Sequence, residues 1–168
     1  MVTIRQHAVK SSAERKSRTP AGDAWSEFVV LVFQLNGLLA AAGDELAQAA
    51  GQTSARWLVL AAVERAPASV ADIARVLNLT RQSVQRVADV LEQDGLAEYH
   101  ENPAHRRAKL LRLTPTGSAA LRTIQAVQQP WADALGLKIG AVKLRDINRG
   151  LATALSALAT PRTSATTP

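Results

Sequence analysis

The segment from Ser69 to Gly95 has the sequence SVADIARVLNLTRQSVQRVADVLEQDG and holds the clearest structural pattern in the chain. It contains two runs of apolar residues at helical spacing, separated by a turn at positions 78–80. Ser69 followed by Asp72 has the pattern of a helix N-cap, and Thr80 is suited to cap the second helix, which we expect to end at Gly95. The segment therefore predicts two helices joined by a tight turn.

The residues after Gly95 change from a helical period to a period of two. Alternation over 96–101 and again over 110–114 predicts two antiparallel strands, and the segment between them, 102–107, is basic and turn-forming. Thr114 and Pro115 then provide the cap and first-turn proline of a further helix. We expect a β-hairpin with a positively charged tip.

Long apolar helices are expected on both sides of this core. A stripe at helical spacing begins at Trp25 and ends at Ala42, and a second segment runs from Ser54 to about Ala66. Further stripes follow the hairpin, with a helix through Pro130, which should bend it without ending it, and a last helix at about 142–159. The fold class is therefore mainly α with a small β-hairpin wing.

The composition excludes several kinds of chemistry. The 168 residues carry a net charge of +6 and no cysteine, so disulfides, cysteine-ligated zinc and cysteine nucleophiles are excluded. The three histidines, His7, His100 and His105, are separated and predict no metal site. We find no glycine-rich phosphate loop and no nucleophile with a base at usable spacing, so we expect neither an enzyme nor a cofactor.

Both ends of the chain differ in composition from the middle. Residues 1–22 hold five basic residues and one acidic residue, which predicts a flexible basic arm, either simply solvated or adding phosphate contacts. Residues 161–168 predict a disordered tail. The N-terminus lacks an apolar signal core, and no uninterrupted apolar run approaches the length of a membrane span, so we expect a cytoplasmic protein without a membrane partner.

The order of helix, tight turn, helix and basic hairpin is suited to reading double-stranded DNA, because a helix fits the major groove. The apolar stripe of the second helix fixes which side chains turn outward, and arginine, glutamine and small hydroxyl residues among them suit base edges and phosphates. The residues that we expect to contact DNA are Thr80, Arg81, Gln82, Ser83, Gln85 and Arg86 on the helix, with Arg106, Arg107 and Lys109 on the hairpin.

Four stretches carry a resemblance to a known family. They are LNLTRQSV at 77–84, LEQDGL at 91–96, NPAHRRAK at 102–109 and LTPTG at 113–117. The chain resembles the MarR family of winged helix-turn-helix regulators, from about Trp25 to Ala159. Its wing departs from the family's Asp-x-Arg-Asp-Arg-Arg pattern.

The differences in the wing are Asn102, Ala104 and His105, which stand where that pattern has charged residues. The ion pairs that orient the wing arginine in the family are therefore not expected here. This makes major-groove contact a firmer expectation than minor-groove contact, and it leaves Arg106 and Arg107 unranked.

The resemblance implies a homodimer in which the first and last helices of both subunits interlock. It implies a MarR-like domain at 23–160, with the winged helix-turn-helix at about 54–114 and dimerisation helices at about 24–50 and 115–159. The implied function is a repressor that binds a pseudo-palindromic operator and is released by a small ligand. The alternative is a winged-helix protein-interaction module without specific DNA binding.

Members of the family often respond to small aromatic or anionic effectors, which implies a ligand cleft. The residues suited to line it are Trp25, Phe28, Phe33, Arg56 and Trp57. In that interpretation Arg56 is available to a carboxylate. The alternative is that these aromatic residues belong to the core and that Arg56 is a surface residue.

Overall fold

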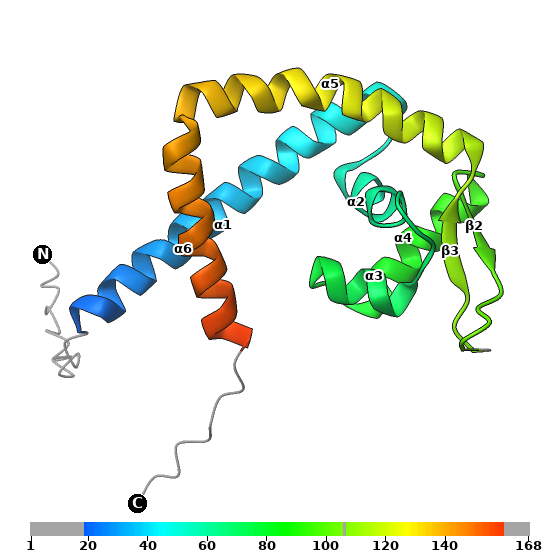
Figure 1. Ribbon diagram of the computed structural model, residues 1–168, viewed down its shortest axis with the longest axis horizontal. Helices are drawn as coiled ribbons and strands as arrows, with labels where there is room; N and C mark the ends of the chain where they lie inside the picture. Colours follow the sequence, from blue (N-terminus) through cyan, green and yellow to red (C-terminus); the bar gives the residue numbers. More distant parts are fainter. Residues whose placement is uncertain (1–18, 106, 160–168) are drawn as a thin grey trace, which may run out of the picture. The chain divides into compact units, whose positions relative to one another are not determined.

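The computed structural model describes residues 19–105 and 107–159 (Figure 1). The chain divides into two compact units, residues 1–40 and 41–168. The first unit contributes most of helix α1 (Pro20–Ala47), which continues into the second. Because α1 begins at Pro20, the last three residues assigned to the basic arm are its first turn. Residues 1–18 of the arm, Arg106 and residues 160–168, which include the predicted tail, lie outside the described residues.

Helix α1 is strongly apolar. Together with the 3₁₀ turn η1 (Gln48–Ala50) it forms a helical run of 31 residues that is long and apolar enough, by length and composition alone, to cross a membrane. The sequence analysis predicted no such segment, because polar residues such as Gln34 and Asn36 interrupt the apolar run. Only 6% of the most apolar window is buried among the described residues.

The second unit contains the helix-turn-helix and the wing. Its helices are α2 (Ser54–Ala62), α3 (Val70–Leu77), α4 (Arg81–Gln93), α5 (Pro115–Ile139) and α6 (Ala141–Ala159). Its strands are β1 (Ala68–Ser69), β2 (Ala97–His100) and β3 (Leu110–Leu113). The predicted fold class, mainly α with a small hairpin, is confirmed. Helix α2 ends at Ala62, about one turn earlier than expected.

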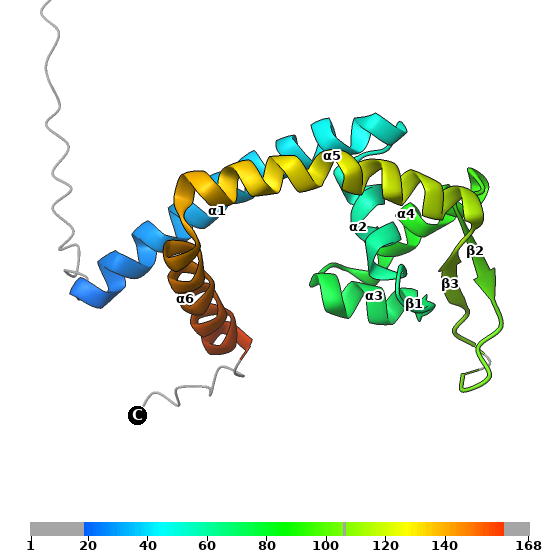
Figure 2. The same ribbon diagram turned by 45° about the horizontal axis from the view of Figure 1, so that its top comes forward.

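The three strands form one antiparallel sheet in the order β1-β3-β2. The hairpin pairs Tyr99 with Leu111, and its tip projects beyond α3 and α4 (Figure 2). Strand β1 pairs Ala68 with Leu111 on the other side of β3, and the sequence did not predict it. It is only two residues long, too short to show a period of two.

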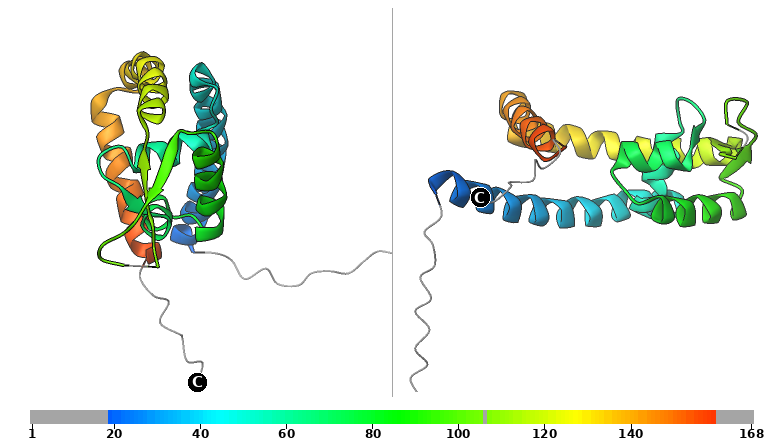
Figure 3. Two further views of the ribbon diagram at one scale, coloured as in Figure 1. Left: turned by 90° about the vertical axis from the view of Figure 1, so that its right-hand side faces the viewer. Right: turned by 90° about the horizontal axis from the view of Figure 1, so that it is seen from below.

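Helix α5 extends from the base of the wing, and α6 follows it in the chain. Pro130 lies inside α5 without ending it, as predicted. Gly140, with φ +89°, separates α5 from α6, and α6 runs steeply away from the axis of α5 (Figures 1 and 3). A residue with a side chain is strained at such a φ, so glycine suits this corner.

The core of the second unit lies between α2, α3, α4 and the sheet. Leu60, Val84, Ala88, Leu91 and Leu111 are each fully buried in it. The three of these on α4 are spaced i, i+4, i+7, which places them on one face of the helix. Burial of this face sets the rotation of α4 and turns its opposite face outward.

Gly117, in the first turn of α5, is where this helix comes closest to the wing. A Cβ at this position would lie 1.8 Å from the carbonyl oxygen of Leu96. The neighbouring Thr114 donates its backbone N–H to the same oxygen at 3.2 Å and its hydroxyl to Gly95 at 2.7 Å. The close approach of α5 to the turn before β2 therefore requires glycine.

We predict that Gly117→Ala destabilises the protein by about 2–3 kcal/mol, because the added methyl group overlaps a backbone oxygen that cannot move alone. Urea denaturation followed by circular dichroism measures this change. The control is Gly136→Ala in the same helix, where an added Cβ meets nothing within 4 Å. The control should be neutral or stabilising by up to about 1 kcal/mol. Equal stability of the two variants would contradict the account of Gly117.

Candidate nucleic-acid interface

The N-terminus of α4 is built by a local cap. Thr80 accepts a hydrogen bond on its hydroxyl oxygen from the backbone N–H of Ser83 at 3.1 Å, as predicted. The six helix residues expected to contact DNA, Thr80, Arg81, Gln82, Ser83, Gln85 and Arg86, are all exposed. Because one face of α4 is buried in the core, the opposite face exposes the predicted side chains to solvent.

Helix α3 lies before α4 and is also capped as predicted. Ser69 accepts from the backbone N–H of Asp72 at 3.2 Å and donates its hydroxyl to the Asp72 carboxylate at 2.6 Å. This hydrogen bond, and then the ion pair with Arg75, lower the pKa of Asp72. Asn78 ends α3 in the left-handed region at φ +52°, which lets the chain turn directly into α4.

The wing has its own polar contacts. Arg112 on β3 donates to the Glu98 carboxylate on β2 at 2.7 Å, and this contact lowers the pKa of Glu98. At the tip, Asn102 accepts from His105 through its backbone oxygen and from Ala104 through its side chain. Among the described residues Arg107 has no ion pair, so its guanidinium has no acidic partner in that part of the chain.

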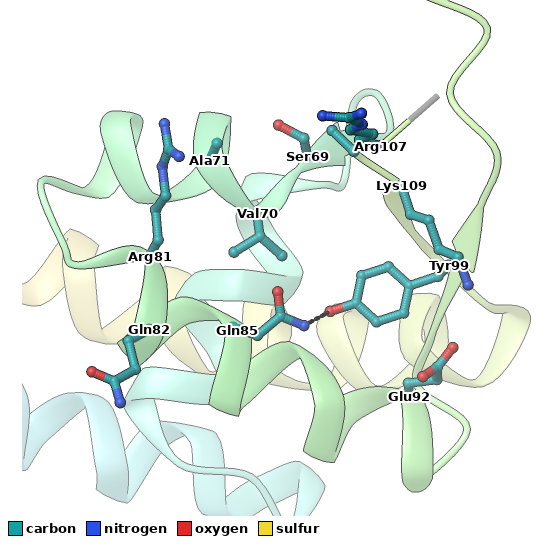
Figure 4. Close-up of a pocket in the computed structure, with 11 residues that line it drawn as sticks. Ser69, Val70, Ala71, Arg81, Gln82, Gln85, Glu92, Tyr99, Arg107 and Lys109 are labelled. Carbon is teal, nitrogen blue, oxygen red and sulfur yellow. Dashed lines mark hydrogen bonds between the residues drawn. The ribbon is translucent and has the colours of Figure 1, made fainter. Parts of the chain in front are cut away.

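A pocket of about 730 Å³ lies between α4, the start of α3 and the wing (Figure 4). Its lining residues are Ser69, Val70, Ala71, Arg81, Gln82, Gln85, Glu92, Tyr99, Arg107, Ala108 and Lys109. Three of them are cationic and one is acidic. The arrangement therefore offers a concave, mainly positive surface to an anionic partner.

The pocket brings together five of the predicted DNA-contact residues. They are Arg81, Gln82, Gln85, Arg107 and Lys109. Thr80 and Ser83 form the cap instead, and Arg86 is exposed on α4 outside the pocket lining. Arg106 lies outside the described residues.

Sequence reasoning missed a side-chain cluster in this pocket. Gln85 donates from its amide nitrogen to the Tyr99 hydroxyl oxygen at 2.9 Å and to the Asp89 carboxylate at 2.6 Å, and Tyr99 donates to the same carboxylate at 3.1 Å. The i, i+4 spacing of Gln85 and Asp89 was the only signal of it in the sequence. Tyr99 reaches them from β2, which the sequence alone does not show.

The residues suggested for an effector cleft lie in both units. In the first unit, the rings of Trp25 and Phe28 stack with their centroids 5.3 Å apart. In the second, Trp57 is half-buried against the core, and Arg56 forms an ion pair with Asp94 at the end of α4. Arg56 thus has an internal carboxylate partner, and its role toward an effector stays a prediction.

Comparison with known proteins agrees with this architecture. The model of the MarR family matches residues 50–108, which include the helix-turn-helix and most of the wing. An uncharacterized protein of Mycobacterium tuberculosis, Rv2011c, is 44% identical over 102 residues, covering 61% of this chain and 71% of that protein.

Two solved structures share the fold. A mutant of the MarR protein from E. coli, complexed with operator DNA, has a TM-score of 0.70 at 23% identity and covers 77% of this chain and 94% of its own. The Staphylococcus aureus MarR protein, in complex with salicylate and kanamycin, has a TM-score of 0.69 at 15% identity and covers 80% of this chain and 92% of its own.

The capped helix pair, the hairpin beside it and the family match from 50 to 108 agree with one another. The chain belongs to the MarR family of winged helix-turn-helix transcription regulators.

Proposed function

We propose that the protein is a homodimeric repressor that binds a pseudo-palindromic operator and is released by a small ligand. The observation that carries the proposal is the pocket with Arg81 and Gln82 on one side and Arg107 and Lys109 on the other. A helix in the major groove brings residues at its N-terminus to the base edges, and a basic wing beside it meets phosphates or the minor groove. The E. coli relative in complex with operator DNA supports this mode of binding.

The dimer is supported by apolar surface outside the helix-turn-helix. On α6, Leu155 is 64% exposed and Leu158 is 68% exposed, and Leu137 near the end of α5 is 86% exposed. Apolar surface of this extent marks an interface in a soluble protein. A two-fold dimer presents two copies of α4, which match two half-sites about one helical turn apart.

Helix α1 belongs to the same proposal. Its apolar side chains at Val32, Leu35, Leu38 and Leu39 are between 36% and 71% exposed. We infer that they are covered by the partner subunit, and that the protein works in the cytoplasm, where its DNA is. A dimer bound over a promoter blocks polymerase, which is why we favour repression.

The effector proposal rests on fewer observations. The family resemblance and the S. aureus relative in complex with salicylate favour a small aromatic or anionic ligand. Trp25, Phe28, Arg56 and Trp57 have suitable chemistry for one. Since Arg56 is paired with Asp94, an anionic ligand at Arg56 competes with that carboxylate.

We predict that Arg81→Ala weakens operator binding by roughly 1–3 kcal/mol and relaxes the preference at one base pair in each half-site, because it removes a forked guanidinium contact to guanine. Fluorescence anisotropy with a set of single-base operator variants measures both effects. The matched control is Arg122→Ala, which removes an exposed arginine on α5 outside the pocket. An equal loss on every sequence would mean that Arg81 holds a phosphate, and absence of sequence preference in the wild type would favour the protein-interaction alternative.

We predict that Leu155→Glu converts the dimer to a monomer, because association would bury an unpaired carboxylate. Sedimentation velocity measures the mass, and operator affinity should fall by at least about tenfold because the monomer engages only one half-site. Thr153→Glu, at an exposed position on the opposite face of α6, is the control for the added charge. A dimer that survives Leu155→Glu would exclude this part of α6 from the interface.

We predict that deletion of residues 1–18 flattens the salt dependence of DNA binding without changing the preferred sequence. The segment carries five basic residues, and removing one phosphate contact lowers the slope of log K against log salt by about 0.9. Titrations at several salt concentrations measure the slope. An unchanged slope would show that the arm makes no phosphate contact.

A further inference from the structure

Tyr99 is the only side chain of the wing in the described residues that hydrogen-bonds to α4. It stands on β2, an edge strand of the sheet, which pairs only with β3. Its ring lines the pocket, and Figure 4 shows the Gln85 amide directed at the phenol oxygen. These hydrogen bonds add a polar link between the wing and α4 to the apolar packing of Tyr99 against the core.

The hydrogen bonds within this cluster use both protons of the Gln85 amide. One goes to the Asp89 carboxylate and the other to the Tyr99 oxygen, while the Tyr99 hydroxyl proton goes to Asp89. A glutamine that pairs with adenine needs one amide proton for the base in addition to its carbonyl oxygen. While the cluster is intact, Gln85 has no free amide proton for a base. Gln82, one turn earlier, has no hydrogen-bond partner among the described residues and remains available.

We propose that Gln85 is a positioning residue and not a base reader, and that with Tyr99 and Asp89 it ties the wing to α4. This tie fixes, before DNA binds, the distance between Arg81 and Gln82 on α4 and Lys109 on the wing. A surface fixed in advance loses less conformational freedom on binding. The inference rests on the proposed DNA binding, and it assigns to the wing strand a role in affinity that requires no contact with DNA.

The protonation of Tyr99 is consistent with this role. Burial, and then the hydrogen bond to Asp89, raise the pKa of Tyr99 to about 12. The charged groups around the phenol are Asp89 and Glu92 on α4 and Lys109 across the pocket. The hydroxyl therefore remains a donor throughout the physiological pH range.

The cluster is tested first without DNA. Tyr99 is the only tyrosine in the chain, so tyrosinate absorbance near 295 nm reports its ionisation alone. We expect a midpoint well above the ordinary value of about 10. Asp89→Asn should move the midpoint down, because it removes the acceptor charge, and Glu92→Gln, the matched control, should move it less. A midpoint that Asp89→Asn leaves unchanged would overturn the tie.

The role in binding is tested with Gln85→Ala, Tyr99→Phe and the double variant on the same set of operator variants. Each single variant should bind every sequence roughly three- to tenfold more weakly, which corresponds to the loss of one or two hydrogen bonds. The base preference should stay unchanged. The affinity of the double variant should equal that of the more affected single variant, because both substitutions break the same cluster. Loss of discrimination at one base pair in Gln85→Ala would show that Gln85 reads that base and would overturn the proposal.

Gln82→Ala is the matched control, because it removes a pocket glutamine without a hydrogen-bond partner in the described residues. It should change the preference at one base pair. If the wild type itself shows no sequence preference, the proposed function fails, and the tyrosine titration still decides whether the tie exists.

Discussion

The full burial of Val84, Ala88 and Leu91 is the constraint on which the proposed DNA-binding surface depends. These residues can be removed from water together only in one rotation of α4. That rotation also places Arg81, Gln82 and Gln85 on the outside of the molecule. The hydrophobic effect, which carries no information about DNA, therefore decides which side chains are available to read it.

Features set by neighbours in the chain could be predicted from the sequence. The caps at Ser69, Thr80 and Thr114 depend on residues three positions away, and all three form as expected. The hairpin depends on an alternation over a few residues. The mainly helical fold class and the positions of most elements followed from such local patterns.

Contacts between distant segments could not be predicted in this way. Arg56 and Asp94 are 38 residues apart, and Gln85 and Tyr99 come from a helix and a strand whose approach is set by the core. Both contacts involve predicted site residues. Arg56 was predicted to be available to a ligand and Gln85 to a base, and each has a partner within the chain. The sequence identified the residue types of the surface but not which of them already have partners within the chain.

The close approach at Gly117 connects the long helix α5 to the segment between α4 and the wing. Thr114 and Gly117 hold the first turn of α5 against Gly95 and Leu96, directly between the end of α4 and the start of β2. Helix α5 then continues for 25 residues, roughly 37 Å at the usual helical rise. Its first turn is held beside the proposed DNA-binding surface, and its other end lies next to α6. If the axis of a helix of that length tilts by about 10° about one end, the other end moves by about 6 Å. This distance exceeds the rise of one helical turn. Because α5 is anchored at Thr114 and Gly117, its direction near α6 is coupled to the segment between α4 and β2.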